Sequence, residues 1–149
     1  MNPDPAEIIV KTTHMKYGQS YYSNNKQLND RIALHFYYRL ASSYIKSGKV
    51  LDFGCGVGHL IKRFKNNYRT YAYDISPYGL QLVKVNSPST TIYSDLDLLR
   101  ETTYDLAISL HVLEHLKNPF EQILFFYDVL NDGGILLYVV PNASALDIN

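Results

Sequence analysis

A short run of glycines at the end of an apolar strand constrains this chain more than any other feature. Residues 50–53 read as a buried strand, and Gly54, Gly56 and Gly58 follow at alternate positions before a helical pattern resumes over 57–66. Because glycine has no Cβ atom and tolerates positive φ, the backbone can turn tightly there and approach a ligand closely. The helix expected after the turn would point unpaired N–H groups at that ligand. We therefore predict a ligand site at the end of this strand.

The remaining chain alternates strands with helices through short links. Such alternation indicates crossover units and a parallel sheet with helices on both faces, whose ligand lies beyond the carboxyl ends of the strands. We predict a helix that starts at Leu28, with Asn29 or Asp30 as its cap and Gly48 at its end. Ser76 is predicted to cap a later helix that has Pro77 at its first position. The predicted strands are 49–53, 70–73, 90–93, 104–110 and 134–140, and the further helices are 57–66, 77–85 and 120–130.

Composition excludes several classes of protein. Fourteen basic residues balance fourteen acidic ones, so no basic excess is available to neutralise a phosphate backbone, and we expect no nucleic-acid partner. The single cysteine, Cys55, has no partner for an internal disulfide and no metal-ligand spacing around it, which predicts a cytoplasmic protein without a metal. The chain shows no leader pattern and no run of roughly 18 apolar residues, so we expect no membrane span.

The two ends of the chain differ from its middle. Residues 1–27 are polar and rich in tyrosine, and we interpret them as an arm or lid on a ligand-binding domain that covers 28–149. The last predicted strand is apolar at successive positions, as in a strand with neighbours on both sides, yet the sequence stops nine residues after Val140. We therefore expect either a fold truncated after its fifth strand or a partner along that edge, such as a second copy in a dimer.

Two motifs resemble those of a known enzyme class. The string D-x-G-C-G-x-G from Asp52 to Gly58 resembles the first motif of class I S-adenosylmethionine (SAM)-dependent methyltransferases, whereas a dinucleotide fingerprint would need glycine at position 59, which is His59. The string from Tyr104 to Pro119 is similar to the Y-D-x-I-x-S-x-x-V-L-E-H-x-x-x-P signature of small-molecule methyltransferases related to the ubiquinone-biosynthesis O-methyltransferases. Together the similarity covers residues 48–142. It implies a Rossmann-like, three-layer αβα sandwich with strand order 3-2-1-4-5.

The resemblance also implies how the cofactor is held. Asp74 ends the second strand 20 residues after Gly54, where a carboxylate can accept both ribose hydroxyls; a helix cap is the alternative. Asp95 is implied to face the exocyclic amine of adenine, with Leu96 against the ring, unless Asp95 only caps the segment that follows. Asp52 is implied to place a negative charge near the methionyl ammonium. The full set of expected cofactor-binding residues is Asp52, Gly54, Cys55, Gly56, Gly58, Asp74, Ile75, Asp95, Leu96, Leu110, His111, Tyr17 and Tyr21.

The chemistry expected of such a site is modest. Methyl transfer from a sulfonium is an in-line displacement, so alignment of the reactants supplies most of the acceleration, and a base matters only when the acceptor carries a proton. His115 is a candidate base and Glu114 could orient it, although both residues could instead fix the turn after the fourth strand. His111 could line the cofactor pocket.

The sequence thus predicts a SAM-dependent methyltransferase that acts on a small molecule, at oxygen, and releases S-adenosylhomocysteine (SAH). Three alternatives remain open. The chain could be a SAM-binding domain without catalysis, which binding without turnover would reveal. An RNA or protein methyltransferase is disfavoured by the neutral charge and by the absence of an N-P-P-[YF] string. A nicotinamide oxidoreductase would bind NAD in preference to SAM.

Overall fold

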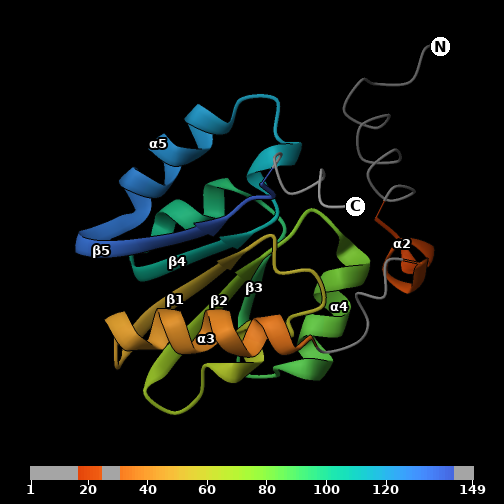
Figure 1. The fold of residues 1–149 in the computed structure, drawn as a ribbon, viewed down its shortest axis with the longest axis horizontal. Coiled ribbons are helices and arrows are strands. Elements are labelled where there is room, and N and C mark those ends of the chain that lie inside the picture. The colour runs from red at the N-terminus through yellow and green to blue at the C-terminus, as the bar shows by residue number, and fades with distance from the viewer. Residues whose placement is uncertain (1–16, 25–30, 143–149) are drawn as a thin grey trace.

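The computed structural model describes residues 17–24 and 31–142, which form a sheet between two layers of helices (Figure 1). Helices α3 and α4 lie on one face of the sheet and α5 lies on the other. The strands are β1 (Gly48–Phe53), β2 (Tyr68–Tyr73), β3 (Thr91–Tyr93), β4 (Tyr104–Leu110) and β5 (Leu130–Val139). The α-helices are α2 (Gln19–Asn24), α3 (Ile32–Tyr44), α4 (Pro77–Asn86) and α5 (Pro119–Val129), and the 3-10 turns are η1 (Ile61–Arg63), η2 (Asp97–Glu101) and η3 (Leu113–His115).

The sheet is parallel throughout and has the order β3-β2-β1-β4-β5, which confirms the predicted topology. Strand β1 lies at its centre, where Val50 pairs with Thr70 of β2 and with Leu106 of β4. Because all strands run the same way, their carboxyl ends meet at one edge, and the order of the strands reverses beside β1. This is where a ligand site is expected in a doubly wound sheet.

Alternate residues of β1 feed two separate hydrophobic cores. Val50 points into the core beneath α3, α4 and η1, where it packs with Ala41 and Val83. Leu51 points to the opposite face and packs with Phe126 and other apolar residues of α5. Both Val50 and Leu51 are fully buried, which is why the strand reads as a continuous apolar run instead of an alternating one. The rigidity of β1 fixes the start of the glycine turn.

The helix predicted over residues 57–66 is wrong. Only the 3-10 turn η1 forms there, because the glycine turn continues to Gly58, whose φ is +81° and whose N–H donates to the carbonyl oxygen of Cys55 at 3.0 Å. Phe64 already has an extended backbone, with φ −81° and ψ 107°. Too few residues remain between these points for an α-helix. The ligand site therefore faces a glycine loop and no helix N-terminus at this position.

The ends of the first long helix also differ from the prediction. Helix α3 starts at Ile32 and ends at Tyr44, and Ile45 follows in an extended conformation. Gly48 begins β1 and does not end the helix; its φ is +120°, and a Cβ atom there would collide with the Asp105 carboxylate. Asp105 uses that space to accept the N–H of Lys49 at 2.7 Å. The predicted caps, Asn29 and Asp30, lie outside the described residues.

The other elements match the prediction within one to three residues at most of their ends. Ser76 caps α4 by accepting the N–H of Gly79 at 3.0 Å, and Pro77 is the first residue of that helix. Strand β5 lies at the edge of the sheet, as expected, where the side chain of Tyr138 is 52% exposed. It begins earlier than predicted, at Leu130, and its pairing with β4 is interrupted by the turn at Gly133. Most of the predicted arm, residues 1–16, lies outside the described residues.

Candidate active site

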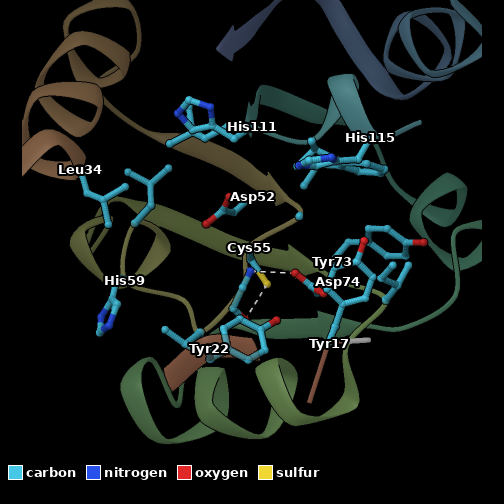
Figure 2. A pocket seen from close by; sticks show the side chains of 18 of the residues that line it. Tyr17, Tyr22, Leu34, Asp52, Cys55, His59, Tyr73, Asp74, His111 and His115 are labelled. Atoms are coloured by element: carbon cyan, nitrogen blue, oxygen red, sulfur yellow. Dashed lines mark hydrogen bonds between the residues drawn. The ribbon is translucent and has the colours of Figure 1, made fainter. Parts of the chain in front are cut away.

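A cavity of about 490 Å³ lies beyond the carboxyl ends of β1, β2 and β4 (Figure 2). Its size is in the range of small-molecule sites. The glycine loop forms its floor, and α2, the start of α3, η3 and α5 contribute its walls. Among the predicted site residues, the cavity is lined by Tyr17, Tyr21, Asp52, Gly54, Cys55, Gly56, Asp74, Ile75, Leu96, Leu110, His111 and His115.

The glycine loop is held by backbone contacts that only glycine permits. The N–H groups of Gly54 and Cys55 both donate to the carbonyl oxygen of Tyr73, at 2.8 and 3.0 Å. Gly54 has φ +77°, and a Cβ atom on it would lie 2.2 Å from Val112 Cγ2. Gly58 does not line the cavity; it closes the turn and faces Val83 instead. Glycine at 54 therefore lets the chain pass close to the loop after β4.

Asp74 joins the glycine loop to the loop after β2. Its Oδ2 atom accepts the N–H of Gly56 and its Oδ1 atom accepts the N–H of Ser76, both at 2.8 Å. Burial raises the pKa of the Asp74 carboxyl, and the N–H donors of Ser76, Gly56 and Ile75 oppose that rise. Each oxygen keeps a further lone pair, so this carboxylate can still accept ligand hydroxyls.

Asp52 is the most unusual group in the cavity. It is 3% exposed, and its Oδ2 atom has no hydrogen-bond partner among the described residues. The pKa of Asp52 is raised to about 7, first by burial and then by the negative charge of Asp74, while the backbone N–H of Ile61 acts to lower it. A buried carboxylate oxygen without a partner is costly, and a cationic or donor group of a ligand would satisfy it.

Burial and the same acids favour the protonated thiol of Cys55. Burial raises the pKa of Cys55 well above its usual value, and the charges of Asp74 and Asp52 add to the effect. The thiolate is the nucleophilic form of cysteine, so this residue is suited to packing.

The segment after β4 places two histidines on the cavity. His111 has a left-handed backbone, with φ +55°, and its N–H donates to the carbonyl oxygen of Val139 at 2.8 Å. Its Nδ1 atom lies 3.6 Å from Oε1 of Glu114, a residue that does not itself line the cavity. Glu114 was expected beside His115 and lies against His111 instead. Figure 2 shows His111 and His115 on either side of the end of β1.

The two residues predicted to contact the adenine base differ in their positions relative to the cavity. Leu96 lines the cavity, whereas Asp95 is exposed and does not. The Oδ1 atom of Asp95 accepts the N–H of Asp97 at 2.9 Å, at the start of η2. Asp95 thus makes a local turn contact just before Leu96, the residue at the N-cap position of η2, and this contact is of the same local kind as the capping role that the sequence left open.

The N-terminal segment reaches the cavity through α2. The carbonyl oxygen of Tyr17 accepts the hydroxyl of Ser76 at 2.6 Å, which ties this segment to the start of α4. The rings of Tyr17 and Tyr21 meet edge to face, with centroids 5.0 Å apart, and Tyr22 is buried. Aromatic side chains thus cover one side of the cavity, next to the glycine loop.

Several lining residues carry no motif and were missed in the sequence. Helix α3 runs antiparallel to β1, so its first residues lie at the edge of the sheet where the strands have their carboxyl ends. In the sequence, only the expectation that this helix runs antiparallel to the next strand could have indicated these residues. Gln122 of α5 gave no signal, since it belongs to no motif and follows Glu121 at the start of a helix where polar residues are common. The lining residues missed in the sequence are Tyr22, Arg31, Ala33, Leu34, Tyr37, Phe53, Val57, His59, Leu60, Tyr73, Val112, Leu116 and Gln122.

Within residues 17–24 and 31–142, no group of three or more His, Cys, Asp or Glu side chains is placed to hold a metal ion. No helix in the described part of the chain is long and apolar enough to cross a membrane.

Several solved structures that share this fold are named as methyltransferases. The plantazolicin methyltransferase BpumL superposes with a TM-score of 0.70 at 17% identity, over 93% of this chain and 63% of that chain. The N-methyltransferase NodS from Bradyrhizobium japonicum has a TM-score of 0.68 at 16% identity, over 87% and 71%. Coclaurine N-methyltransferase has a TM-score of 0.60 at 22% identity, over 71% and 34%. The present chain therefore spans between about a third and about 70% of the length of these proteins.

No curated protein sequence matches the chain at a significant level. A protein family described as a methyltransferase domain matches residues 25–148, a range that includes the glycine loop, Asp52, Asp74 and the segment after β4. Because this match covers most of the sequence and the fold agrees with it, the chain belongs to the methyltransferase domain family.

Proposed function

We propose that the cavity binds S-adenosylmethionine and that the protein transfers its methyl group to a small-molecule acceptor. The observation that carries this proposal is the unpartnered, buried Oδ2 atom of Asp52 beside the glycine loop. SAM carries a sulfonium and an ammonium group, and either cation would stabilise that oxygen. BpumL, NodS and coclaurine N-methyltransferase were each crystallised with SAH, the product of SAM after transfer, which supports the same ligand here.

The predicted cofactor residues suit the parts of this ligand. Asp74 is proposed to accept the ribose hydroxyls, while Asp52 and the backbone from Gly54 to Gly56 hold the methionyl group. Ile75 and Leu96 would contact the nucleoside, and Leu110 and His111 would contact the methionyl end from the other side. Gly58 is proposed to act through the shape of the loop and Asp95 from the rim, because neither lines the cavity.

The N-terminal segment is proposed to close over the ligand. Tyr17 and Tyr21 line the cavity from outside the sheet, and the hydrogen bond between Tyr17 and Ser76 fixes them beside the glycine loop. This supports the division into an arm or lid, residues 1–27, and a binding domain, residues 28–149.

SAM supplies a methyl group on a good leaving group, so the protein needs to align the acceptor and to take up a proton. Two imidazoles on the cavity are proposed for the proton: His115, from the family resemblance, and His111, whose Nδ1 atom lies 3.6 Å from Oε1 of Glu114. A carboxylate on one ring nitrogen fixes the orientation of an imidazole and leaves the other nitrogen for the acceptor.

The acceptor is proposed to be a hydroxyl oxygen, because the segment from Tyr104 to Pro119 is similar to the ubiquinone-related O-methyltransferases. The names of NodS and coclaurine N-methyltransferase make nitrogen the competing acceptor. We further propose a reducing, cytoplasmic location, in line with the one free cysteine, and a partner strand or second copy along the exposed edge of β5.

A labelled-methyl experiment tests this function. The protein is first titrated with SAM and SAH by calorimetry, and then incubated with methyl-deuterated SAM and a small-molecule cell extract. We expect micromolar binding and one or more products that carry a trideuterated methyl group, with fragment masses that distinguish O-methyl from N-methyl. Binding without any labelled product would favour a non-catalytic SAM-binding domain, and preference for NAD over SAM would contradict the proposal.

A further inference from the structure

One polar side chain in the wall of the cavity has no partner that explains it. Gln122 lies in the first turns of α5 and is 8% exposed, and its Nε2 atom has no hydrogen-bond partner among the described residues. The same residue lines the cavity. A buried amide N–H without an acceptor costs free energy, so such a group in a binding cavity indicates a ligand acceptor.

Gln122 is polar, whereas the other buried residues on its helix are apolar. The other buried residues of α5 are Phe125, Phe126 and Val129, which all pack into the apolar core below the sheet. Leucine or methionine would fill the position of Gln122 without an unpaired donor. Packing therefore gives no reason for an amide at this position.

The cavity that Gln122 lines also has apolar walls that suit a flat aromatic ring. The apolar side chains of Leu96, Val112 and Leu116 line the cavity with it. Leu96 directly precedes η2, and η2 is tied to α5 by the 2.9 Å ion pair between Arg100 and Asp128. The polar groups that suit a ribose or a methionyl group, Asp74 and Asp52, come from β2 and β1 instead. The α5 side of the cavity is thus the side for the base.

Adenine presents ring nitrogens as acceptors along its edges, and an amide is the side chain that pairs with it most naturally. Asp95, which family resemblance would assign to the base, is exposed and accepts the N–H of Asp97. We propose that Gln122 reads the adenine of the cofactor by donating its Nε2–H to a ring nitrogen of the purine. This inference rests on the proposed cofactor and adds a specificity-determining residue to its site.

Calorimetry with purine analogues tests the assignment without a methyl acceptor. SAH and its 1-deaza, 3-deaza and 7-deaza analogues are titrated into the full chain and into the variants Gln122→Met and Gln122→Glu. We expect Gln122→Met to bind SAH three- to tenfold more weakly. One deaza analogue should bind the unmodified protein more weakly by a similar factor, yet bind Gln122→Met as SAH does, because the hydrogen bond is already lost. Gln122→Glu should bind SAH more weakly than Gln122→Met, since a carboxylate oxygen would face a ring lone pair.

Two controls separate the possible outcomes. Gln81→Met changes an exposed glutamine of α4 and should leave SAH binding unchanged. The melting temperature of Gln122→Met should equal or exceed that of the unmodified protein, because a buried unpaired donor is replaced by an apolar chain of similar volume. Unchanged SAH affinity in Gln122→Met, or equal losses with all three deaza analogues in both proteins, would overturn the assignment. Failure of the unmodified protein to bind SAH would instead refute the proposed function.

Discussion

The carboxylate of Glu114 lies against His111, with 3.6 Å between Oε1 and Nδ1, although the sequence placed Glu114 beside His115. The two residues are three positions apart and span the start of η3, so the turn itself brings them together. The left-handed backbone of His111 then points its ring toward the cavity. This pairing makes His111 the better oriented of the two proposed bases.

Substitution of His111 by glycine tests that role directly. Glycine suits a φ of +55°, so the variant should fold at least as well as the original protein. We expect turnover to fall by about 100-fold or more, which is the lower end of general-base contributions. Added imidazole should restore part of the activity by occupying the space of the lost ring. SAH formation with the acceptor found by isotope labelling measures both effects.

His115→Gly and His35→Gly are the comparison variants. His35 lies on the exposed side of α3, away from the cavity, and its loss should not change turnover. Rescue of His115→Gly by imidazole, without rescue of His111→Gly, would assign the proton to His115 instead.

Removal of the Asp74 carboxylate should weaken SAM binding. Asp74→Ala would lose the two hydrogen bonds that we propose from the ribose hydroxyls to its carboxylate, each worth on the order of 1.5–3 kcal/mol. Asp95→Ala should cost far less, because that side chain is exposed and outside the cavity. Calorimetric titration with SAH gives both values. The 2′,3′-dideoxy analogue of SAH should bind Asp74→Ala and the unmodified protein alike, and a persistent difference would mean that Asp74 only shapes the loops.

The raised pKa of Asp52 makes stability depend on pH. The folded protein keeps a proton on Asp52 up to about pH 7, whereas the unfolded chain releases it near its ordinary value of 3.8. The folded state therefore binds more protons between these values, so stability falls as pH rises through this window and levels off above it. Asp52→Asn should flatten this dependence and raise the melting temperature at pH 8. An equally steep decline in the variant would assign the effect to other groups.

The same group should couple cofactor binding to pH in the opposite direction. A cation beside Asp52 favours its ionised form, so SAM should displace the proton, and its affinity should rise with pH until about 7. Calorimetry in buffers with different ionisation enthalpies counts the released protons. Asp52→Asn should bind SAM more weakly at pH 8 and release none from this site.

The glycine loop offers a matched pair of substitutions. Gly54→Ala forces a Cβ atom into a left-handed position and against Val112, which should destabilise the fold by about 2–4 kcal/mol. Gly133 has nearly the same φ, +76°, but nothing lies within 4 Å of its Cβ position. Gly133→Ala should thus cost only about 1–2 kcal/mol for the backbone conformation. Urea denaturation measures both, and equal losses would show that the contact with Val112 relaxes freely.

The periodic parts of the sequence predicted the fold well. Strand β1 and strand β4 were recognised by their apolar runs, and the cap at Ser76 with Pro77 fixed the start of α4. These signals are local, since strand burial, capping and proline geometry each depend on a few neighbouring residues. The expected helix after the glycine loop did not form because left-handed glycines at alternate positions, Gly54, Gly56 and Gly58, used up the residues that it needed.

The site was predictable only where a motif marked it. The glycine loop, Asp52 and Asp74 lie at strand ends, and a parallel sheet necessarily gathers these ends at one edge. The pairing of Glu114 with His111 depends on the φ of a single residue, which no sequence pattern revealed. Gln122 became visible only once its burial and its missing partner were known.

Every described residue that lines the cavity precedes α5's third turn, and none comes from β5. Strand β5 completes this edge of the sheet, and its Val139 accepts one backbone hydrogen bond from His111, but the described lining of the cavity comes from the three inner strands, their loops and the helices. The cavity and the exposed edge of the sheet at β5 therefore belong to separate parts of one small domain. In a domain arranged in this way, another strand can pair with β5 without changing the affinity of the cavity for its ligand.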